Sequence, residues 1–296
     1  MITGLHIETT NKCTLKCPRC SRTEFIEQFP KAWVNKELDL EAFKKFFDLE
    51  NLTINLNGTY GDSIYYSELF ELIKFLKSKH CNISISTNGS YQTKEWWQEL
   101  GSILDQRDQI VFGIDGLPEN FTTYRINADW DSIKLGIETL KDYDVKLVWQ
   151  YILFSYNEHC VEQAKDLSNE LGFDEFLVIP SARFDHDSDT LIPSTGRDSI
   201  STNKIEWKQN KNIDIDPICK RENDRHYISA DGYYTPCCWS GEHRFFYKSE
   251  FWKNKDTYDI RKTTLSQLLS YKQTVDFYSD LETTKPEYCT FNCPKG

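Results

Sequence analysis

The first 180 residues alternate short β-branched runs with amphipathic helical patterns, and this alternation constrains the fold more than any other feature. Six strands are predicted, at residues 5–9, 52–57, 82–87, 109–114, 145–153 and 175–179. Helical patterns lie between them at residues 40–48, 67–79, 94–104, 129–143 and 158–171. Consecutive strand–helix units of this kind predict an α/β fold with a parallel sheet.

The alternation ends at Pro180, where a polar stretch begins and continues to about residue 212. We therefore expect a first domain at residues 1–182, a linker at 183–213 and a small α+β extension at 214–296. In the extension, Asp231-Gly232 is typical of a turn between two short strands, and a helix is predicted near residues 264–277. The linker contains His186, which is either a general base or part of a solvated charged loop.

Composition excludes several classes of protein. The chain has 296 residues, 39% of them hydrophobic, which is enough for a sizeable core and excludes disorder as the main description. The net charge of -11 repels a phosphate backbone, so bulk nucleic-acid binding is disfavoured. No apolar run approaches the roughly 18 to 20 residues that span a bilayer, and the N-terminus lacks an export signal. A soluble, cytoplasmic protein without a membrane partner is expected.

Ten cysteines are unusual in a chain without an export signal, because a reducing compartment favours metal or catalytic roles over disulfides. Cys81 and Cys160 stand alone and are expected to be buried apolar residues. The other eight form three groups, which are Cys13, Cys17 and Cys20, then Cys219, Cys237 and Cys238, and finally Cys289 and Cys293.

The first group, Cys13, Cys17 and Cys20, directly follows the first predicted strand. A [4Fe-4S] cluster held by three thiolates keeps one iron without a protein ligand, and that iron can bind a substrate or cofactor. The alternative is a zinc site, although structural zinc requires four closed ligands.

This segment resembles the signature of the radical S-adenosylmethionine (radical SAM) superfamily, which has three cysteines at this spacing in the loop after the first barrel strand. The resemblance covers about the first 180 residues and departs at Arg19, where the family usually has an aromatic residue. It implies a partial (β/α)6 barrel of the TIM type, closed at its open side by the extension. It also implies that the cluster binds the amino and carboxylate groups of S-adenosylmethionine.

The resemblance assigns further cofactor contacts near the second and third strands. Tyr60, Gly61 and Asp62 lie where the family has a Gly-Gly-Glu-like motif that grips the methionine amino group. Glycine permits close backbone approach and a carboxylate suits an ammonium, while the alternative is an ordinary turn. Asn88 lies in Thr87-Asn88-Gly89, which matches the Thr-Asn-Gly pattern of the family.

Near the fourth strand, Gly113-Ile114-Asp115-Gly116 matches the Ser-Ile-Asp-Gly pattern of the family, with Gly113 in place of serine. The hydroxyl that often contacts the cofactor ribose is therefore absent, and Asn88 or Gln150 is expected to take its place. Arg125 stands where relatives with auxiliary clusters use an arginine for the cofactor carboxylate, for which its bidentate fork is suited.

The positions of these residues along the chain also favour a site, independently of any family. Each lies at or just after the C-terminal end of a predicted strand, the face where parallel barrels place their chemistry. His6 and Glu8 share one face of the first strand and are candidates to line the barrel mouth. For Asn88 and Asp115 the alternative is a role in stabilising a turn.

The C-terminal cysteines resemble the SPASM and twitch extensions of radical SAM enzymes. Cys219 is followed by Cys237 after seventeen residues, and with Cys289 and Cys293 these thiols can close one auxiliary [4Fe-4S] cluster, which favours the shorter twitch form. Of Cys237 and its neighbour Cys238, one is expected to be a spare, because adjacent side chains diverge on a strand. The alternative is a zinc site on the same four thiols.

The resemblance predicts an enzyme that reductively cleaves S-adenosylmethionine to a 5′-deoxyadenosyl radical, which abstracts a substrate hydrogen. An auxiliary cluster suits an oxidation (dehydrogenation) or a cross-link, and an external electron donor such as flavodoxin or ferredoxin is implied. The substrate is expected to be a small molecule or a peptide. The peptide is slightly less favoured, because the chain begins at the first strand without a leader-recognition domain. The alternatives are a radical SAM methyltransferase or isomerase, and a non-catalytic zinc-binding module.

Overall fold

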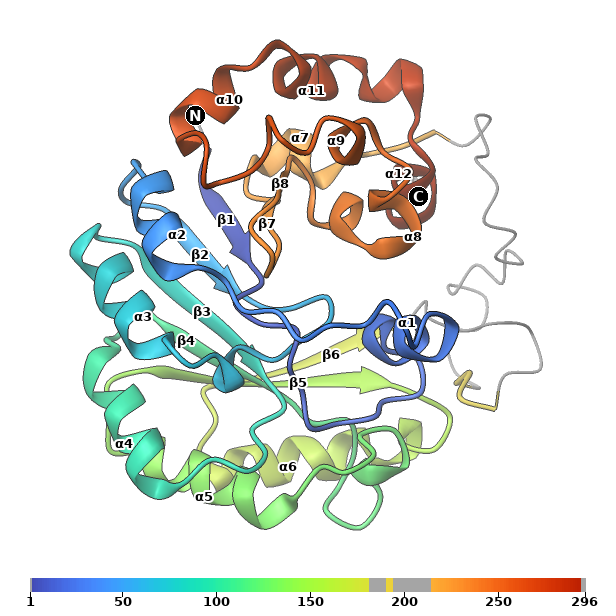
Figure 1. The fold of residues 1–296 in the computed structure, drawn as a ribbon. Coiled ribbons are helices and arrows are strands. Elements are labelled where there is room, and N and C mark those ends of the chain that lie inside the picture. Colours follow the sequence, from blue (N-terminus) through green and yellow to red (C-terminus); the bar gives the residue numbers. More distant parts are fainter. Residues whose placement is uncertain (1, 181–189, 194–213, 294–296) are drawn as a thin grey trace.

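An eight-stranded sheet with the order β6-β5-β4-β3-β2-β1-β7-β8 organises the described residues of the protein (Figure 1). The structure is a computed structural model that describes residues 2–180, 190–193 and 214–293. Six strands are parallel and lie where they were predicted, at β1 (Gly4–Ile7), β2 (Thr53–Leu56), β3 (Asn82–Thr87), β4 (Gln109–Gly113), β5 (Lys146–Leu153) and β6 (Glu175–Pro180). The predicted parallel α/β fold is confirmed.

Helices cover the outer face of these strands, as Figure 1 shows. They follow the predicted helical patterns and are α2 (Leu40–Phe46), α3 (Leu69–Ser78), α4 (Lys94–Ile103), α5 (Trp130–Leu140) and α6 (Val161–Leu171). Helix α6 is preceded by a short 3-10 turn, η3 (Glu158–Cys160), and ends at Gly172, whose φ of 77° is the left-handed conformation of a C-cap. No helix among the described residues is long and apolar enough to cross a membrane.

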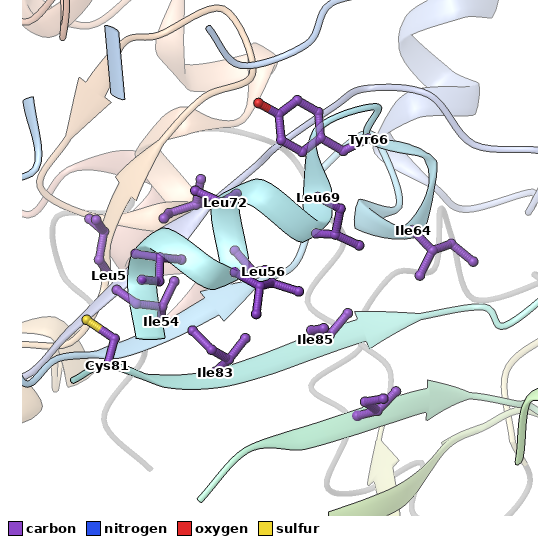
Figure 2. Close-up of a cluster of buried hydrophobic side chains, with 14 of the residues drawn as sticks. Leu5, Ile54, Leu56, Ile64, Tyr66, Leu69, Leu72, Cys81, Ile83 and Ile85 are labelled. Atoms are coloured by element: carbon purple, nitrogen blue, oxygen red, sulfur yellow. The ribbon is translucent and has the colours of Figure 1, made fainter. Parts of the chain in front are cut away.

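The alternating strand pattern separates an apolar outer layer from a more polar inner surface. Figure 2 shows Leu69 and Leu72 of α3 against apolar side chains of β2 and β3, which include Ile54, Leu56, Ile83 and Ile85. Each such burial stabilises the fold by about 2 kcal/mol. The residues between them point the other way, and on this inner surface Gln109 donates a hydrogen bond of 2.9 Å to Ser84. Polar groups therefore face the concave side of the barrel.

The extension joins the barrel through its sheet. Strand β7 (His226–Ile228) pairs in parallel with β1, with His226 opposite Leu5, and β8 (Tyr234–Thr235) pairs with β7 in the antiparallel sense. Gly232 has a φ of 83° in the turn between them, which confirms the predicted hairpin. The extension thus adjoins the β1 edge, whereas in the described residues the opposite edge strand, β6, pairs with β5 alone.

The helices of the extension have six residues or fewer, except α11, which has 13. They are α7 (Ile218–Glu222), η4 (Cys238–Gly241), α8 (His243–Phe246), α9 (Glu250–Lys253), α10 (Leu265–Ser270), α11 (Lys272–Thr284) and α12 (Glu287–Asn292). The prediction of a single helix at residues 264–277 is wrong. The helix is interrupted between α10 and α11 at Tyr271, which has an extended ψ of 136°. Most of the predicted linker, including His186, lies outside the described residues. Cys81 and Cys160 are buried, as expected.

Candidate functional site

Cys13, Cys17 and Cys20 lie in the loop that connects β1 to α1 (Ser21–Gln28), a helix that was not predicted. Cys20 is the N-cap of α1, and its N–H donates to the carbonyl of Cys17 at 3.2 Å. The loop therefore folds back on itself, and Cys13 and Cys20 pack against the buried cluster that contains Cys17. The start of α1 anchors the third cysteine in this arrangement.

Apolar side chains surround the three thiols. Cys17 packs in one buried cluster with Leu15, Tyr124 and Phe154, and the rings of Tyr124 and Phe154 are 4.4 Å apart. Burial raises the pKa of Cys13 to about 12 and that of Cys17 to about 11, so both thiols keep their protons unless a cationic centre replaces them. Such a donor set fits an iron–sulfur cluster in a site that excludes water.

Asn88 contacts this loop directly. The amide Nδ2 of Asn88 donates to Sγ of Cys13 at 3.7 Å, and the N–H of Leu15 donates to the same sulfur at 3.4 Å. Hydrogen bonds to ligating sulfur are one of the features that set the reduction potential of an iron–sulfur cluster. The structure thus brings the end of β3 and the three-cysteine loop together.

Asp62 ties the loop after β2 to the end of β3. Its Oδ2 accepts hydrogen bonds from the Asn88 N–H at 2.7 Å, the Asn88 amide at 2.5 Å and the Thr87 hydroxyl at 3.1 Å, and its Oδ1 accepts from the N–H of Ile64 at 3.2 Å. Burial raises its pKa to about 6. The hydrogen bonds of the Asp62 carboxylate are thus made to protein groups, which fix the loop against β3.

Gly61 has a close backbone approach that explains the residue type. A Cβ on Gly61 would lie 1.9 Å from the carbonyl oxygen of Thr10, so any side chain there would separate the loop from the end of β1. The N–H groups of Tyr60 and Gly61 point at Oε1 of Glu8, at 2.6 and 3.2 Å. Backbone donors and acceptors of residues 60–62 are thereby held beside the three-cysteine loop.

Glu8 is a central residue of the site whose partners were not predicted. It follows β1 directly, is 1% exposed, and its Oε2 accepts a hydrogen bond from the phenol of Tyr227 on β7. Burial raises its pKa to about 7, opposed by the hydrogen bonds that it accepts. Tyr60 makes a second link, since its phenol oxygen accepts the N–H of His243 on α8 at 2.5 Å. An acidic residue directly after an apolar strand was the available sequence signal.

A cavity of about 240 Å³ lies where these groups meet. It is lined by Glu8 and Tyr60, by Phe25 and Trp33 from the segment after the cysteines, and by side chains of the extension that include His243, Phe246 and Tyr247. The cavity therefore borders both the barrel and the extension.

Asp115 and Arg125 form a buried ion pair after β4. Arg125 Nε lies 2.6 Å from Oδ2 of Asp115, whose Oδ1 accepts the N–H of Ile152 at 2.8 Å. Burial raises the pKa of Asp115, while Arg125 opposes that effect. Gln150 is the register partner of Gly113 on β5, next to this pair. Arg125 lies over the ring of Tyr124, which packs in the same buried cluster as Cys17, so it lies at the three-cysteine loop.

The C-terminal thiols converge on a second cavity, of about 200 Å³. Cys219, Cys237, Cys289 and Cys293 all line it, together with residues that include Arg225 and Tyr288. Burial raises the pKa of Cys289 and Cys293, so these thiols too are neutral without a metal centre. Four thiols around one cavity fit a fully ligated cluster.

Cys238 adjoins Cys237 but is not among the residues that line this cavity. Cys237 precedes η4 with extended backbone, and Cys238 is the first residue of η4. Of the adjacent pair, Cys237 is therefore the one beside the other three thiols, and its role as the ligand stays a prediction.

Comparison with known families agrees with this geometry. Residues 7–167, more than half of the chain, match the family model described as the radical SAM superfamily. The chain belongs to the radical SAM superfamily. Residues 219–294 match the SPASM model, described as an iron–sulfur cluster-binding domain. These matches imply S-adenosylmethionine, a [4Fe-4S] cluster in the barrel and auxiliary iron–sulfur binding in the extension.

Two curated relatives illustrate this superfamily. The chain is 23% identical over 218 residues to an AdoMet-dependent heme synthase of Nitratidesulfovibrio vulgaris, covering 72% of this chain and 58% of the relative. It is 25% identical over 178 residues to a PqqA peptide cyclase of Bradyrhizobium diazoefficiens, covering 58% of this chain and 44% of the relative. The chain thus spans about half the length of these relatives.

Solved structures show the same fold. Streptococcus suis SuiB bound to its precursor peptide SuiA superimposes with a TM-score of 0.57 at 12% identity, covering 92% of this chain and 67% of that one. SuiB bound to S-adenosylmethionine gives a TM-score of 0.55 at 14% identity, covering 98% and 77%. At these identities the likeness concerns the fold alone.

Proposed function

We propose that this radical SAM enzyme is an oxidoreductase that removes a hydrogen atom from a small molecule or a peptide and oxidises or cross-links it. The observation that carries the proposal is the β1–β7 pairing, which joins a three-thiol loop and a four-thiol cavity through one sheet. A site that starts a radical reaction and a site suited to electron transfer then belong to one rigid unit.

In this proposal Cys13, Cys17 and Cys20 hold the cluster that binds S-adenosylmethionine. When bound, the cluster and the cofactor supply a 5′-deoxyadenosyl radical by reductive cleavage, with the electron provided by an external donor such as flavodoxin or ferredoxin. The apolar residues around Cys17 keep water and oxygen away from this chemistry.

Residues at the ends of β2 to β5 orient the cofactor in this proposal. The backbone of Tyr60 and Gly61, fixed by Glu8 and by Asp62, faces the methionine amino group. Asn88 and Gln150 face the ribose, and Arg125 faces the carboxylate, for which a guanidinium fork is suited. Asp115 belongs to the same set through its ion pair with Arg125.

Cys219, Cys237, Cys289 and Cys293 hold the auxiliary cluster in this proposal, and its chemistry there is acceptance of an electron. The buried carboxylate of Glu8 lines the cavity of about 240 Å³ between the two domains, where a substrate would meet both. The names of the relatives support both substrate classes, since one makes heme and another cyclises a peptide.

The test measures iron, sulfide and zinc in the anaerobically reconstituted protein, together with 5′-deoxyadenosine formed from S-adenosylmethionine and dithionite. We expect near eight irons, about four after Cys13, Cys17 and Cys20 are all changed to alanine, and loss of 5′-deoxyadenosine in that variant. A matched variant with alanine at Cys219, Cys237, Cys289 and Cys293 should also keep about four irons, but retain cleavage. Zinc without iron in all three proteins would overturn the proposal, as would cleavage that survives in the first variant.

The reaction class has its own test. Once a substrate is found, an oxidation consumes one cofactor for each two-electron product, with no methyl group transferred and a product two hydrogens lighter. An isomer of the substrate, or a methylated product, would instead assign the enzyme to the alternative classes.

A further inference from the structure

Both carboxylate oxygens of Asp115 accept hydrogen bonds from protein groups. Its carboxylate is buried, with Oδ2 bonded to Nε of Arg125 at 2.6 Å and Oδ1 bonded to the N–H of Ile152 at 2.8 Å. Its backbone carbonyl accepts hydrogen bonds from the phenol of Tyr156 and from the amide of Asn157, the latter at 3.0 Å. Such a carboxylate is built to hold a partner in place, because it has no freedom to follow a ligand.

Gly113 leaves the space that Arg125 fills. A Cβ on Gly113 would lie 2.7 Å from Nη2 and 3.3 Å from Cζ of Arg125. The guanidinium therefore occupies the position of a side chain at residue 113. This contact gives a physical reason for glycine at a place where the family usually has serine, and it means that a donor of another kind stands there.

The guanidinium is directed toward the three-cysteine loop. One of its five N–H donors, at Nε, is taken by Asp115, while the Nη atoms extend over Gly113. The group lies over the ring of Tyr124, with Cζ 5.8 Å from the ring centroid, and Tyr124 packs in one buried cluster with Cys17. Its side chain is 17% exposed, so its charge is little screened.

We propose that Asp115 and Gly113 are positioning residues that hold the Arg125 guanidinium against Cys17, where it raises the reduction potential of the iron–sulfur centre and binds the carboxylate of S-adenosylmethionine. This inference rests on the proposed function of the three-cysteine loop. A fixed cation beside an anionic centre favours the form with one more electron. Asp115 then acts on the cofactor through Arg125, not by contact with it.

Cofactor affinity gives the first test. S-adenosylmethionine is titrated calorimetrically, without reductant, into reconstituted wild-type protein, Asp115→Asn, Arg125→Gln and the double variant. We expect each single change to weaken the Kd by about ten- to a hundredfold, as for loss of a charge-assisted bidentate contact, and the double variant to equal Arg125→Gln. If Asp115→Asn weakens binding equally in the presence and absence of Arg125, Asp115 contacts the cofactor itself and the proposal fails.

The reduction potential gives the second test, measured by redox titration followed by electron paramagnetic resonance without S-adenosylmethionine. Arg125→Gln and Gly113→Ala should both move the barrel cluster to more negative potential, the second with Asp115 and Arg125 intact. Arg125→Lys keeps the positive charge but loses the bidentate fork. It should therefore change the reduction potential of the barrel cluster less than it weakens the affinity for S-adenosylmethionine. An unchanged potential in Arg125→Gln and Gly113→Ala would overturn the proposal.

Asp108→Asn is the matched control, because Asp108 is another buried carboxylate that pairs with a cationic side chain, Lys77, at 2.6 Å. Asp108 directly precedes β4, so it lies at the end of the strand opposite to Asp115. It should leave both the Kd and the potential unchanged. A change in Asp108→Asn equal to that in Asp115→Asn would show a general packing effect and overturn the assignment. Iron content separates the two levels: no iron in the wild-type barrel refutes the proposed function, whereas normal iron with an unaltered Kd refutes this inference alone.

Discussion

The phenol of Tyr227, on the first strand of the extension, donates a hydrogen bond to the carboxylate of Glu8, 219 residues earlier in the chain. The same carboxylate accepts the N–H groups of Tyr60 and Gly61. One buried side chain therefore fixes the end of β1, the loop after β2 and strand β7 relative to one another. A displacement of the extension at Tyr227 would consequently move Glu8 and, through it, the loop after β2 that we assign to the cofactor.

Because of Glu8, we expect the free energy of unfolding to depend on pH. Its pKa is raised to about 7 in the folded protein from 4.5, so folding favours the protonated form. This contribution is fully present below pH 4.5 and is lost as the pH rises to 7, by up to about 3 kcal/mol. Glu8→Gln keeps the shape without the titration. Urea unfolding of both proteins between pH 4.5 and 8 should show wild type losing stability relative to Glu8→Gln up to pH 7, with a constant difference above it. A constant difference throughout would contradict the assigned pKa.

Gly61→Ala should separate the loop after β2 from β1, because its Cβ would lie 1.9 Å from the carbonyl of Thr10. We expect both a loss of stability of about 2 kcal/mol and a weaker Kd for S-adenosylmethionine. Gly136→Ala on α5 is the control, since its Cβ would lie 2.7 Å from Trp97, away from the cysteines. That variant should lose stability and keep its Kd. Equal Kd values in the two variants would count against a cofactor role for the loop.

The adjacent cysteines should differ in iron binding. Cys237→Ser removes a thiol that lines the C-terminal cavity, whereas Cys238→Ser does not. Iron content and visible absorption should therefore fall in Cys237→Ser and match wild type in Cys238→Ser. The reverse result would mean that the chain rearranges on cluster binding.

We expect Asp108 to contribute strongly to stability at the end of the barrel opposite the cysteines. It accepts hydrogen bonds from the N–H groups of Ile83 and Asp105, at 2.7 and 2.9 Å, and pairs with Lys77. Asp108→Ala leaves these donors buried and unpaired, so we expect a loss of about 3 kcal/mol in chemical unfolding. Asp105→Ala, which removes an exposed carboxylate from the same lysine, should cost at most about 1 kcal/mol. Similar losses in both variants would contradict this account.

Local patterns predicted the six parallel strands because each strand has a continuous apolar face and each helix an apolar stripe. The three-cysteine loop was predicted for a similar reason, since its three thiols lie within eight residues. The parallel pairing of β7 with β1 was not predicted, because three residues such as 226–228 carry no signal for a partner over 200 residues away.

In the candidate site too, local features could be predicted from the sequence, whereas contacts made by tertiary packing could not. The sequence showed that Gly113 lacks a hydroxyl and favoured Asn88 or Gln150 as its replacement, which stays a prediction. It did not show that the guanidinium of Arg125 fills the space beside Gly113. The partners of Glu8 and Tyr60 were missed because they belong to β7 and α8, which tertiary packing alone brings to the barrel. The helix at 264–277 was wrong because helical periodicity continues past Tyr271, where the backbone turns.

The position of β1 between β2 and β7 has a consequence for truncated forms of the protein. A fragment that stops at residue 180 would carry β1 as a bare edge, with its N–H and carbonyl groups free to recruit another copy of the same strand. In the described residues the extension therefore covers the β1 edge of the barrel with a strand of its own. Barrel fragments designed for mechanistic work should precipitate unless β7 is supplied in trans or replaced by a charged edge.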